Sequence, residues 1–310
     1  MPRARFTTDE VVKLTLEFYR RNYIEGLCLS SGIIKSPDYT MEQMKEIARK
    51  LRVEHQFQGY IHLKSIANAA PELIHEAGLF SDRLSINIEM PTDVALSQIA
   101  PEKDVVAIKK AMSSISEKIL SAGEPTIIKK RIEKFVPAGQ STQVIVGADH
   151  SSDTVILNRS ASLYTGYKLM RVYYSAFSPI PDSSVKLPLI KPPLMREHRL
   201  YQADWLMRLY GFNVDEITPV ETGMLDLDID PKLAWALLHR GDFPVIVNSA
   251  PYEKLLRVPG FGVKTVRKIV SSRRHAKLRY ADIVKLGANM KNAKSFILTP
   301  DWHPVQQSTR

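Results

Sequence analysis

The chain has 310 residues, of which 44% are hydrophobic and 25% charged, and this composition excludes disordered and collagen-like proteins. Its formal net charge of +10 is concentrated in one segment, because residues 257–294 carry eleven basic side chains and one acid, while the other 272 residues carry 32 of each sign. A uniformly basic surface is therefore excluded, and a local site for a polyanion is favoured.

Membrane and disulfide-bonded classes are also disfavoured. No stretch approaches the roughly 18 uncharged apolar residues of a membrane span, and the first residues lack the apolar core of a secretory signal. We therefore expect a cytoplasmic protein with no membrane partner. The single cysteine, Cys28, permits no internal disulfide, and the eight histidines show no metal-ligand spacing, so no metal ligands are predicted.

The first 180 residues alternate between amphipathic stretches and short apolar runs. The periodicity predicts helices over 8–22, 41–55, 70–77 and 103–123, and strands over 24–29, 59–64, 83–89, 143–147 and 172–177. This alternation predicts a parallel sheet with crossover helices, either a barrel or an open doubly wound sheet. The opening helix is either an addition to that fold or a sign that a first strand is missing.

The second half of the chain has a different pattern. Five prolines between residues 179 and 193 predict a linker over 181–196, which separates a domain at 1–180 from a domain at 197–310. Helical periodicity covers 197–210, 231–240 and 252–287 without strand–helix alternation. We expect the second domain to be mainly helical.

Polar residues follow the apolar runs at the strand ends, where ligands of parallel sheets bind. Ser30, Ser31 and Gly32 follow the first run and are small enough to bring backbone amides close to an anionic group, although a tight turn is the alternative explanation. Lys64 ends the second run, where it is either a charge partner or an amine nucleophile that forms a Schiff base.

The run over 83–89 alternates strictly, with Ser85, Asn87 and Glu89 on one face. Inside a barrel these groups would meet a ligand or one another, because unpaired buried polar groups are costly, while the alternative is a sheet edge with a solvated face. Glu89 at the strand end suits a ribose diol or an ammonium group. Gly147 ends the fourth run, and helix capping explains the polar residues after it without a ligand.

The second domain contains the sharpest motif, Leu-Arg-Val-Pro-Gly-Phe-Gly-Val-Lys-Thr at 256–265. Its glycines permit a tight turn between two helices, and the second helix can hold a phosphate at its N-terminus. This helix-hairpin-helix pattern, at about 250–290, binds nucleic acid through backbone phosphates, and a purely structural turn is the alternative. The expected DNA contacts are Pro259, Gly260, Gly262, Lys264, Thr265, Arg267, Lys268, Arg273 and Arg274.

Seven sequence blocks in order resemble one family. The blocks GLCLSSG, GYIHLK, RLSINIEMP, TQVIVGADHSSDTVIL, YQADWLMRLYGF, DPKLAWALLHRGDFPVIVN and LLRVPGFGVKT are similar to those of radical SAM proteins of DNA modification or repair, over residues 5–298. The resemblance implies a partial (β/α)6 barrel that binds S-adenosylmethionine against a 4Fe-4S cluster, joined to a mainly helical domain with the helix-hairpin-helix. It also implies action on DNA and a partner enzyme of DNA repair.

The resemblance assigns roles to individual residues. Residues 30–32 stand where the methionine amino group is held, Asn87 and Glu89 at the ribose-binding strand, and Gly147 beside adenine. The residues expected to hold S-adenosylmethionine are Ser30, Ser31, Gly32, Lys64, Ser85, Asn87, Glu89 and Gly147.

One departure from the family is serious. The family holds its cluster with three cysteines spaced Cys-x3-Cys-x2-Cys after the first barrel strand, and neither motif nor strand is present, while Cys28 lies within the second family strand. We therefore expect a truncated member that binds no cluster and cleaves no S-adenosylmethionine, whether a fragment, a misplaced start codon or a decayed gene. The alternatives are a non-catalytic nucleic-acid-binding protein that uses residues 257–294, and a barrel lyase that uses Lys64.

Overall fold

The computed structural model describes residues 5–123, 134–179 and 186–304. The chain divides into two compact units, the first comprising Met1–His150 and Arg159–Lys191, and the second comprising Ser151–Asn158 and Pro192–Arg310. Residues 181–185 of the expected linker lie outside the described residues.

The first unit is built on a parallel sheet of five strands, and every strand pairs with its neighbour in sequence. The strands are β1 (Gly26–Leu29), β2 (Tyr60–Lys64), β3 (Arg83–Ser85), β4 (Gln140–Val146) and β5 (Arg171–Ala176). Right-handed crossovers between strands in this order bring the connecting helices to one face of the sheet. The prediction of a mixed α/β unit with a parallel sheet is thus confirmed, and the sheet is compatible with a partial barrel.

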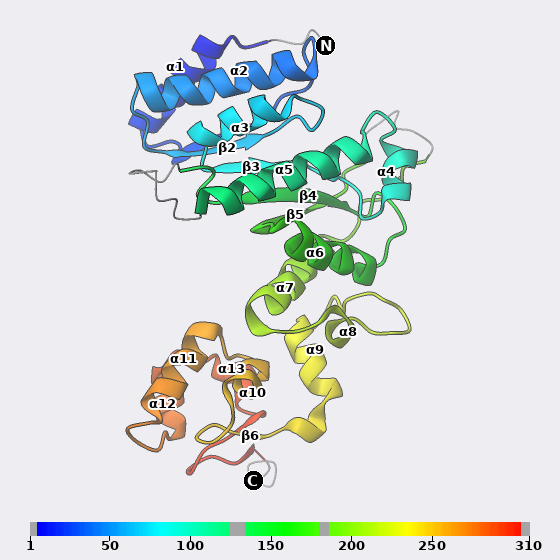
Figure 1. The fold of residues 1–310 in the computed structure, drawn as a ribbon. Helices are drawn as coiled ribbons and strands as arrows, with labels where there is room; N and C mark the ends of the chain where they lie inside the picture. Colours follow the sequence, from blue (N-terminus) through cyan, green and yellow to red (C-terminus); the bar gives the residue numbers. More distant parts are fainter. Residues whose placement is uncertain (1–4, 124–133, 180–185, 305–310) are drawn as a thin grey trace. The chain divides into compact units, whose positions relative to one another are not determined.

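Six of the described helices lie in this unit, the last of them only from Arg159 onward. They are α1 (Thr8–Arg20), α2 (Pro37–Arg49) with a π-helical turn at Lys50–Glu54, α3 (Pro71–Phe80), α4 (Asp93–Ile99), α5 (Val105–Gly123) and α6 (Asp153–Tyr167). In Figure 1, α2, α3 and α5 lie side by side along the sheet, and α2 packs on α3. Local signals explain where they begin: Thr7 and Glu10 form a capping box before α1, and Ser36 caps α2.

Side chains that alternate along the strands separate the packed face of the sheet from its polar face. In β2, Ile61 and Leu63 are fully buried, and they alternate with His62 and Lys64. The register pairs Lys64 with Ser85, so the polar side chains of neighbouring strands share the face opposite the apolar ones. This arrangement leaves the helix-facing side for packing and the other side for polar chemistry.

Several element boundaries differ from the predictions. Strand β3 ends at Ser85 instead of continuing to Glu89, because the Ile88 N–H bonds the Thr142 hydroxyl, and Glu89 rejoins β4 only as an isolated bridge to Val144. Helix α4 was not predicted, and α6 extends over Asp153–Tyr167 where the sequence indicated only helix capping after Gly147. Both differences arise because the apolar periodicity of these helices is weak, with polar residues interspersed.

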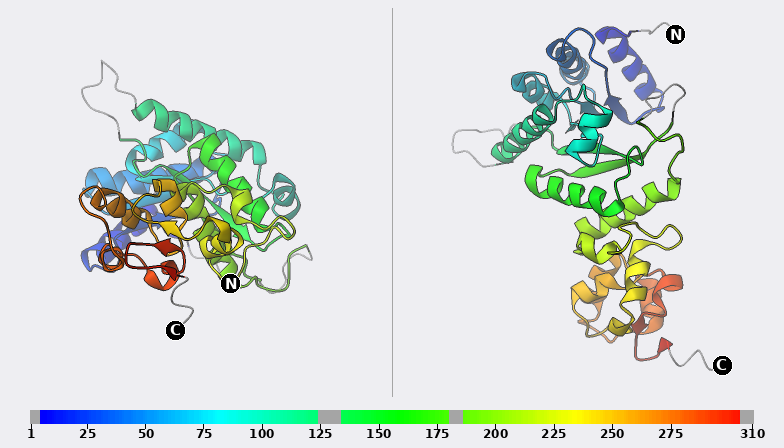
Figure 2. Two further views of the ribbon diagram at one scale, coloured as in Figure 1. Left: turned by 90° about the horizontal axis from the view of Figure 1, so that it is seen from below. Right: turned by 90° about the vertical axis from the view of Figure 1, so that its right-hand side faces the viewer.

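The second unit is mainly helical, as predicted. Its elements are α7 (Leu194–Tyr210), α8 (Val214–Ile217), α9 (Pro231–Leu238), a 3-10 turn at Arg240–Asp242, α10 (Tyr252–Arg257), α11 (Val263–Ser272), α12 (Tyr280–Lys285) and α13 (Met290–Ala293). The sequence did not predict β6 (Val245–Ile246) and β7 (Ile297–Leu298), which pair in parallel. The segments from α10 to β7 gather into one cluster in each view of Figure 2. Among the described helices, none combines the length and apolarity that a membrane crossing requires.

Candidate functional site

The carboxyl ends of β1, β2 and β3 border a cavity of about 440 Å³, within the range of roughly 300–1,000 Å³ for small-molecule sites. The sheet brings these strand ends together although they are separated by tens of residues in sequence. Six of the eight residues expected to hold S-adenosylmethionine line this cavity: Ser30, Ser31, Gly32, Lys64, Asn87 and Glu89.

Glu89 is held in an unusual conformation at the cavity wall. Its φ of +58° lies in the left-handed region, and its backbone is fixed by hydrogen bonds from its N–H to Gln143 O (3.0 Å) and from Ile145 N–H to its carbonyl (2.7 Å). Its carboxylate accepts from Lys103 Nζ at 2.8 Å and from Asn87 Nδ2 at 3.4 Å. Such strain persists only where the surroundings over-determine it, and it concentrates at functional sites.

The second strand end supplies an ammonium group and a hydroxyl group. Lys64 Nζ donates to Gln143 Oε1 at 3.2 Å. The Ser65 N–H donates to the Ser85 carbonyl at 2.8 Å, while the buried Ser65 Oγ has no hydrogen-bond partner among the described residues. Because an unsatisfied buried polar group costs about 1–3 kcal/mol, a ligand that bonds this hydroxyl gains affinity.

The first strand end and the apolar wall complete the cavity. Ser31 Oγ donates to the Gly32 carbonyl at 2.8 Å, and the space beside the Gly32 Cα is open, so backbone groups of this loop are accessible. The apolar wall is formed by Ile33, Ile66, Ile86 and Ile108. The cavity therefore combines an apolar surface with the carboxylates of Glu89, Glu102 and Asp104, the ammonium groups of Lys64 and Lys103, and free hydroxyl and backbone groups.

Two of the expected cofactor residues lie elsewhere. Ser85 is 2% exposed, and its hydroxyl bonds His62 Nε2 at 3.0 Å instead of lining the cavity. Gly147 follows β4 with a φ of +80° and is not among the cavity residues. The predicted alternation put Ser85 on the polar face of the sheet, as observed. Its hydroxyl does not reach the cavity, because it is bonded to His62 on the neighbouring strand.

Burial lowers the pKa of His62 to about 4, and the positive charges of Arg83 and Lys64 act in the same direction. The imidazole is therefore neutral near pH 7, with Cys28 Sγ 3.7 Å from Nδ1. This neutral side chain packs on the polar face of the sheet and joins β1, β2 and β3.

Sequence reasoning missed several residues that border the cavity. Ser65 and Asn68 belong to the loop after β2, while Glu102, Lys103 and Asp104 precede α5. The loop residues lack any periodic signal, and only the fold brings Lys103 to Glu89, fourteen residues away in sequence.

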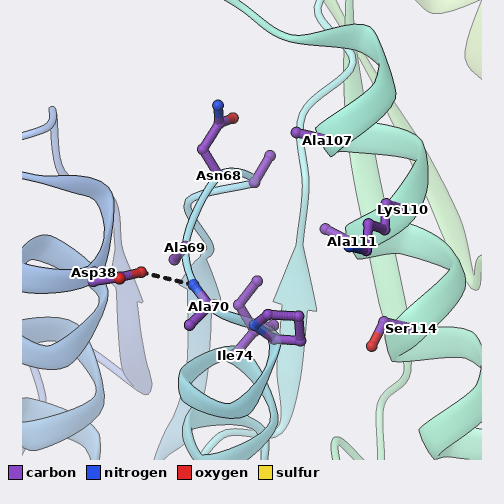
Figure 3. Close-up of a pocket in the computed structure, with 11 residues that line it drawn as sticks. Asp38, Asn68, Ala69, Ala70, Ile74, Ala107, Lys110, Ala111 and Ser114 are labelled. Carbon is purple, nitrogen blue, oxygen red and sulfur yellow. Dashed lines mark hydrogen bonds between the residues drawn. The ribbon is translucent and has the colours of Figure 1, made fainter.

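A second cavity of about 370 Å³ shares Ala67 and Asn68 with the first. Figure 3 shows that alanines of α5 and of the loop before α3 form much of its wall, with Lys110 on α5. Its carboxylate, Asp38, already accepts a hydrogen bond from the Ala70 N–H at 2.7 Å. The first cavity thus offers more uncommitted polar chemistry than the second.

In the second unit, residues 258–262 form the turn between α10 and α11. Gly260 has a φ of +80°, and a Cβ there would lie 2.3 Å from the Asn289 carbonyl oxygen, so only glycine fits. The Gly260 carbonyl also accepts from the Asn289 N–H at 3.0 Å, which ties the turn to the start of α13. Pro259 is buried, so its role is to shape the turn.

Helix α11 presents a basic face. Lys264, Arg267 and Lys268 are exposed and lie three and four residues apart, hence on one side of the helix. Thr265 is 7% exposed and bonds the Gly287 carbonyl at 3.2 Å, so its side chain belongs to the packing instead. The basic residues of α11 therefore share one solvent-facing side.

Within the described chain, the N-terminus of α11 keeps three free N–H groups, while the N–H of its first residue, Val263, donates to the Tyr210 hydroxyl. Its N-cap is Gly262, which has no side chain to cap the helix, and the first intrahelical bond runs from Val266 N–H to the Gly262 carbonyl at 2.9 Å. In the described part of the chain, the N–H groups of Gly262, Lys264 and Thr265 have no hydrogen-bond acceptor. Such N–H groups, with the helix dipole behind them, favour an anion.

Not all basic residues of 257–294 are available for a ligand. Arg273 donates to the carbonyls of Val247 (2.9 Å) and Ala250 (2.6 Å), and Arg257 pairs with Glu216 at 2.8 Å. Arg274, an expected DNA contact, is exposed. Among the described residues, nine of the eleven cations are exposed and have no carboxylate within ion-pair distance: Lys264, Arg267, Lys268, Arg274, Lys277, Arg279, Lys285, Lys291 and Lys294.

No family model, curated protein or solved structure matches the chain. Over the described residues, no group of three or more metal-ligating side chains comes together.

Proposed function

We propose that the chain is a radical SAM-type protein of DNA modification or repair, which binds S-adenosylmethionine at the carboxyl edge of its sheet and DNA through its helical unit. One observation carries the proposal. Six residues singled out from three separate strand ends border one cavity whose size suits a small molecule.

The chemistry of this cavity suits a ligand that joins a nucleoside to an amino acid. Glu89 offers a carboxylate to a ribose diol or to an ammonium group, and Lys103 beside it offers a positive charge to a ligand carboxylate. The loop at residues 30–32 offers backbone groups, and the isoleucine wall suits a flat base. Each part of S-adenosylmethionine thus has residues of complementary chemistry.

The residues of this chain do not fit the 4Fe-4S cluster. Such a cluster requires several thiolates, and the chain has one cysteine, Cys28. Reductive cleavage of S-adenosylmethionine is therefore not assigned to this chain, and its proposed activities are the binding of the nucleoside ligand and of DNA.

Calorimetric titration with S-adenosylmethionine tests the first site. We expect saturable binding that weakens by about tenfold or more in Glu89→Gln and in Asn87→Ala, because each variant removes a polar partner at the cavity wall. Lys110→Ala, in the neighbouring cavity, is the matched control and keeps the parent affinity. Absence of binding, or parent affinity in Glu89→Gln, would refute the site.

The DNA site has independent support from nine exposed cations of the described chain that have no carboxylate within ion-pair distance. Binding through phosphates releases counterions, so the logarithm of the affinity falls with the logarithm of the salt concentration by about 0.9 for each phosphate contacted. Fluorescence anisotropy with a short labelled duplex measures this slope. We expect a slope of several units and little dependence on base sequence, whereas a protein that binds no duplex at low salt does not have the proposed function.

A further inference from the structure

A buried lysine lies directly beneath the turn that precedes α11. Lys232, the second residue of α9, is 7% exposed, and its Nζ donates to the Phe261 carbonyl oxygen at 2.6 Å. The same ammonium group lies 4.7 Å from the centre of the Tyr210 ring. Burying a lysine amine is costly, so a fold that keeps one here gains something from its placement.

The contact to Phe261 orients a peptide that borders the free N–H groups at the start of α11. Phe261 and Gly262 share one peptide unit, and in a planar trans peptide the C=O and the N–H point in opposite directions. Because the carbonyl is bonded to Lys232, the Gly262 N–H points away from it and belongs to the free donors at the α11 N-terminus. The bond to a cation also polarises this peptide, which makes its N–H a stronger donor.

We propose that Lys232 is a positioning residue of the phosphate site at the α11 N-terminus: its ammonium group fixes the Phe261–Gly262 peptide, and its buried positive charge strengthens the binding of a DNA phosphate there. This inference rests on the proposed DNA-binding function. Lys232 does not contact the phosphate itself but acts through the peptide, whereas Lys264 is exposed beside the site.

The charge of Lys232 responds to pH. Burial lowers its pKa to about 7, and the nearby carboxylate of Asp230 acts in the opposite direction. The other titratable groups on this side are Tyr210, whose pKa is raised by burial although its hydroxyl accepts from the Val263 N–H, and Tyr252, which interacts with that phenol. A phosphate bound at the helix end favours the ammonium form, so DNA binding takes up a proton and the affinity falls as the pH rises above about 7.

The test measures duplex affinity by anisotropy between about pH 7 and pH 9.5, above the range where ordinary histidines titrate. A His275→Gln background removes the exposed histidine of the basic segment. We expect the affinity to fall by roughly three- to tenfold over this range, since a tenfold change corresponds to a pKa difference of one unit between free and bound protein. In Lys232→Met the dependence on pH disappears.

Lys264→Met is the matched control, because it removes an exposed cation from the same helix end. We expect it to lower the affinity and reduce the salt slope by about 0.9 while it keeps the dependence on pH. A second measurement uses the parent protein alone and therefore does not depend on whether Lys232→Met folds. Calorimetry near pH 8 in buffers of different ionisation enthalpy reports the number of protons taken up on DNA binding.

The outcomes separate the two proposals. A parent protein that binds duplex without proton uptake, or a folded Lys232→Met variant that keeps the dependence on pH, overturns the role of Lys232 and leaves the DNA site intact. A parent protein that binds no duplex at low salt refutes the DNA site and the role of Lys232 together.

Discussion

The ion pairs of the sheet unit contrast with the basic segment of the helical unit, residues 257–294. In the sheet unit, cations from separate elements meet carboxylates, as in Lys50 with Asp9, Arg52 with Asp82 and Lys103 with Glu89. In the basic segment of the helical unit, Arg257 alone among the described cations has a carboxylate within ion-pair distance, and Arg279 interacts with Asp301 only at longer range. These ion pairs of the first unit thus connect its elements, whereas nine of the eleven described cations of the basic segment are left for a ligand.

The two candidate sites differ in the same way. The sheet cavity is concave and mixes a few charges with an apolar wall, as small-molecule sites do. The helical site is an exposed basic face beside a helix N-terminus with free N–H groups, which suits an extended polyanion. Four predictions test this contrast.

Gly260→Ala should have the largest effect, because it damages the turn on which the helical site depends. The added Cβ would meet the Asn289 carbonyl at 2.3 Å in a left-handed conformation, so we expect a loss of about 3 kcal/mol or more in the free energy of unfolding of this unit. Gly211→Ala is the control, since Gly211 is also left-handed but has open space around it, and it costs about 1–2 kcal/mol. Urea denaturation measures both, and equal losses would show that the close approach is unimportant.

The double variant Lys264→Glu, Arg267→Glu tests whether the unpaired charge binds DNA. We expect about a 100-fold loss of duplex affinity at low salt, because two attractions become repulsions on one face of α11. Lys13→Glu reverses an exposed charge on α1 of the sheet unit and serves as the control, with a change of no more than about twofold. Anisotropy titration measures both proteins, and equal losses would assign the binding to net charge instead of to a site.

The third prediction concerns the pH dependence of stability that arises from the buried, neutral His62. Its pKa is lowered to about 4 in the folded protein, against 6.5 for an ordinary histidine, so the unfolded chain binds the proton first as the pH falls. The stability is therefore full above about pH 6.5 and decreases toward pH 4, by on the order of 2 kcal/mol. His62→Gln should flatten this dependence in urea denaturation, while His55→Gln, at an exposed position, should not.

Lys103→Met should have the smallest effect on folding. The pair with Glu89 is partly exposed, so its loss costs less than about 1 kcal/mol of unfolding free energy. Its effect on S-adenosylmethionine affinity should be larger than its effect on stability, since Lys103 borders the cavity. A stability loss well above about 1 kcal/mol, with unchanged affinity for S-adenosylmethionine, would show that the pair stabilises the fold and does not contribute to ligand binding.

Much of the sheet unit was predictable from the sequence. Apolar residues recur every second position in its strands, and they form a stripe along one side of its helices. The alternation over 83–89 placed Ser85, Asn87 and Glu89 on one polar face, and two of these residues border the cavity. Helix α4 and the two-residue strands β6 and β7 were missed, since such short elements owe their existence to neighbours and not to their own pattern.

The sequence by itself determined which residues are polar at the strand ends, that the positive charge lies in 38 residues, and that one cysteine cannot hold an iron–sulfur cluster. These are local properties of composition and spacing. Only the tertiary structure decided that Glu89 meets Lys103, that Arg273 is engaged by backbone carbonyls, and that Lys232 lies beneath the turn before α11. Contacts of this kind join distant parts of the chain, and the packing of the whole unit sets them.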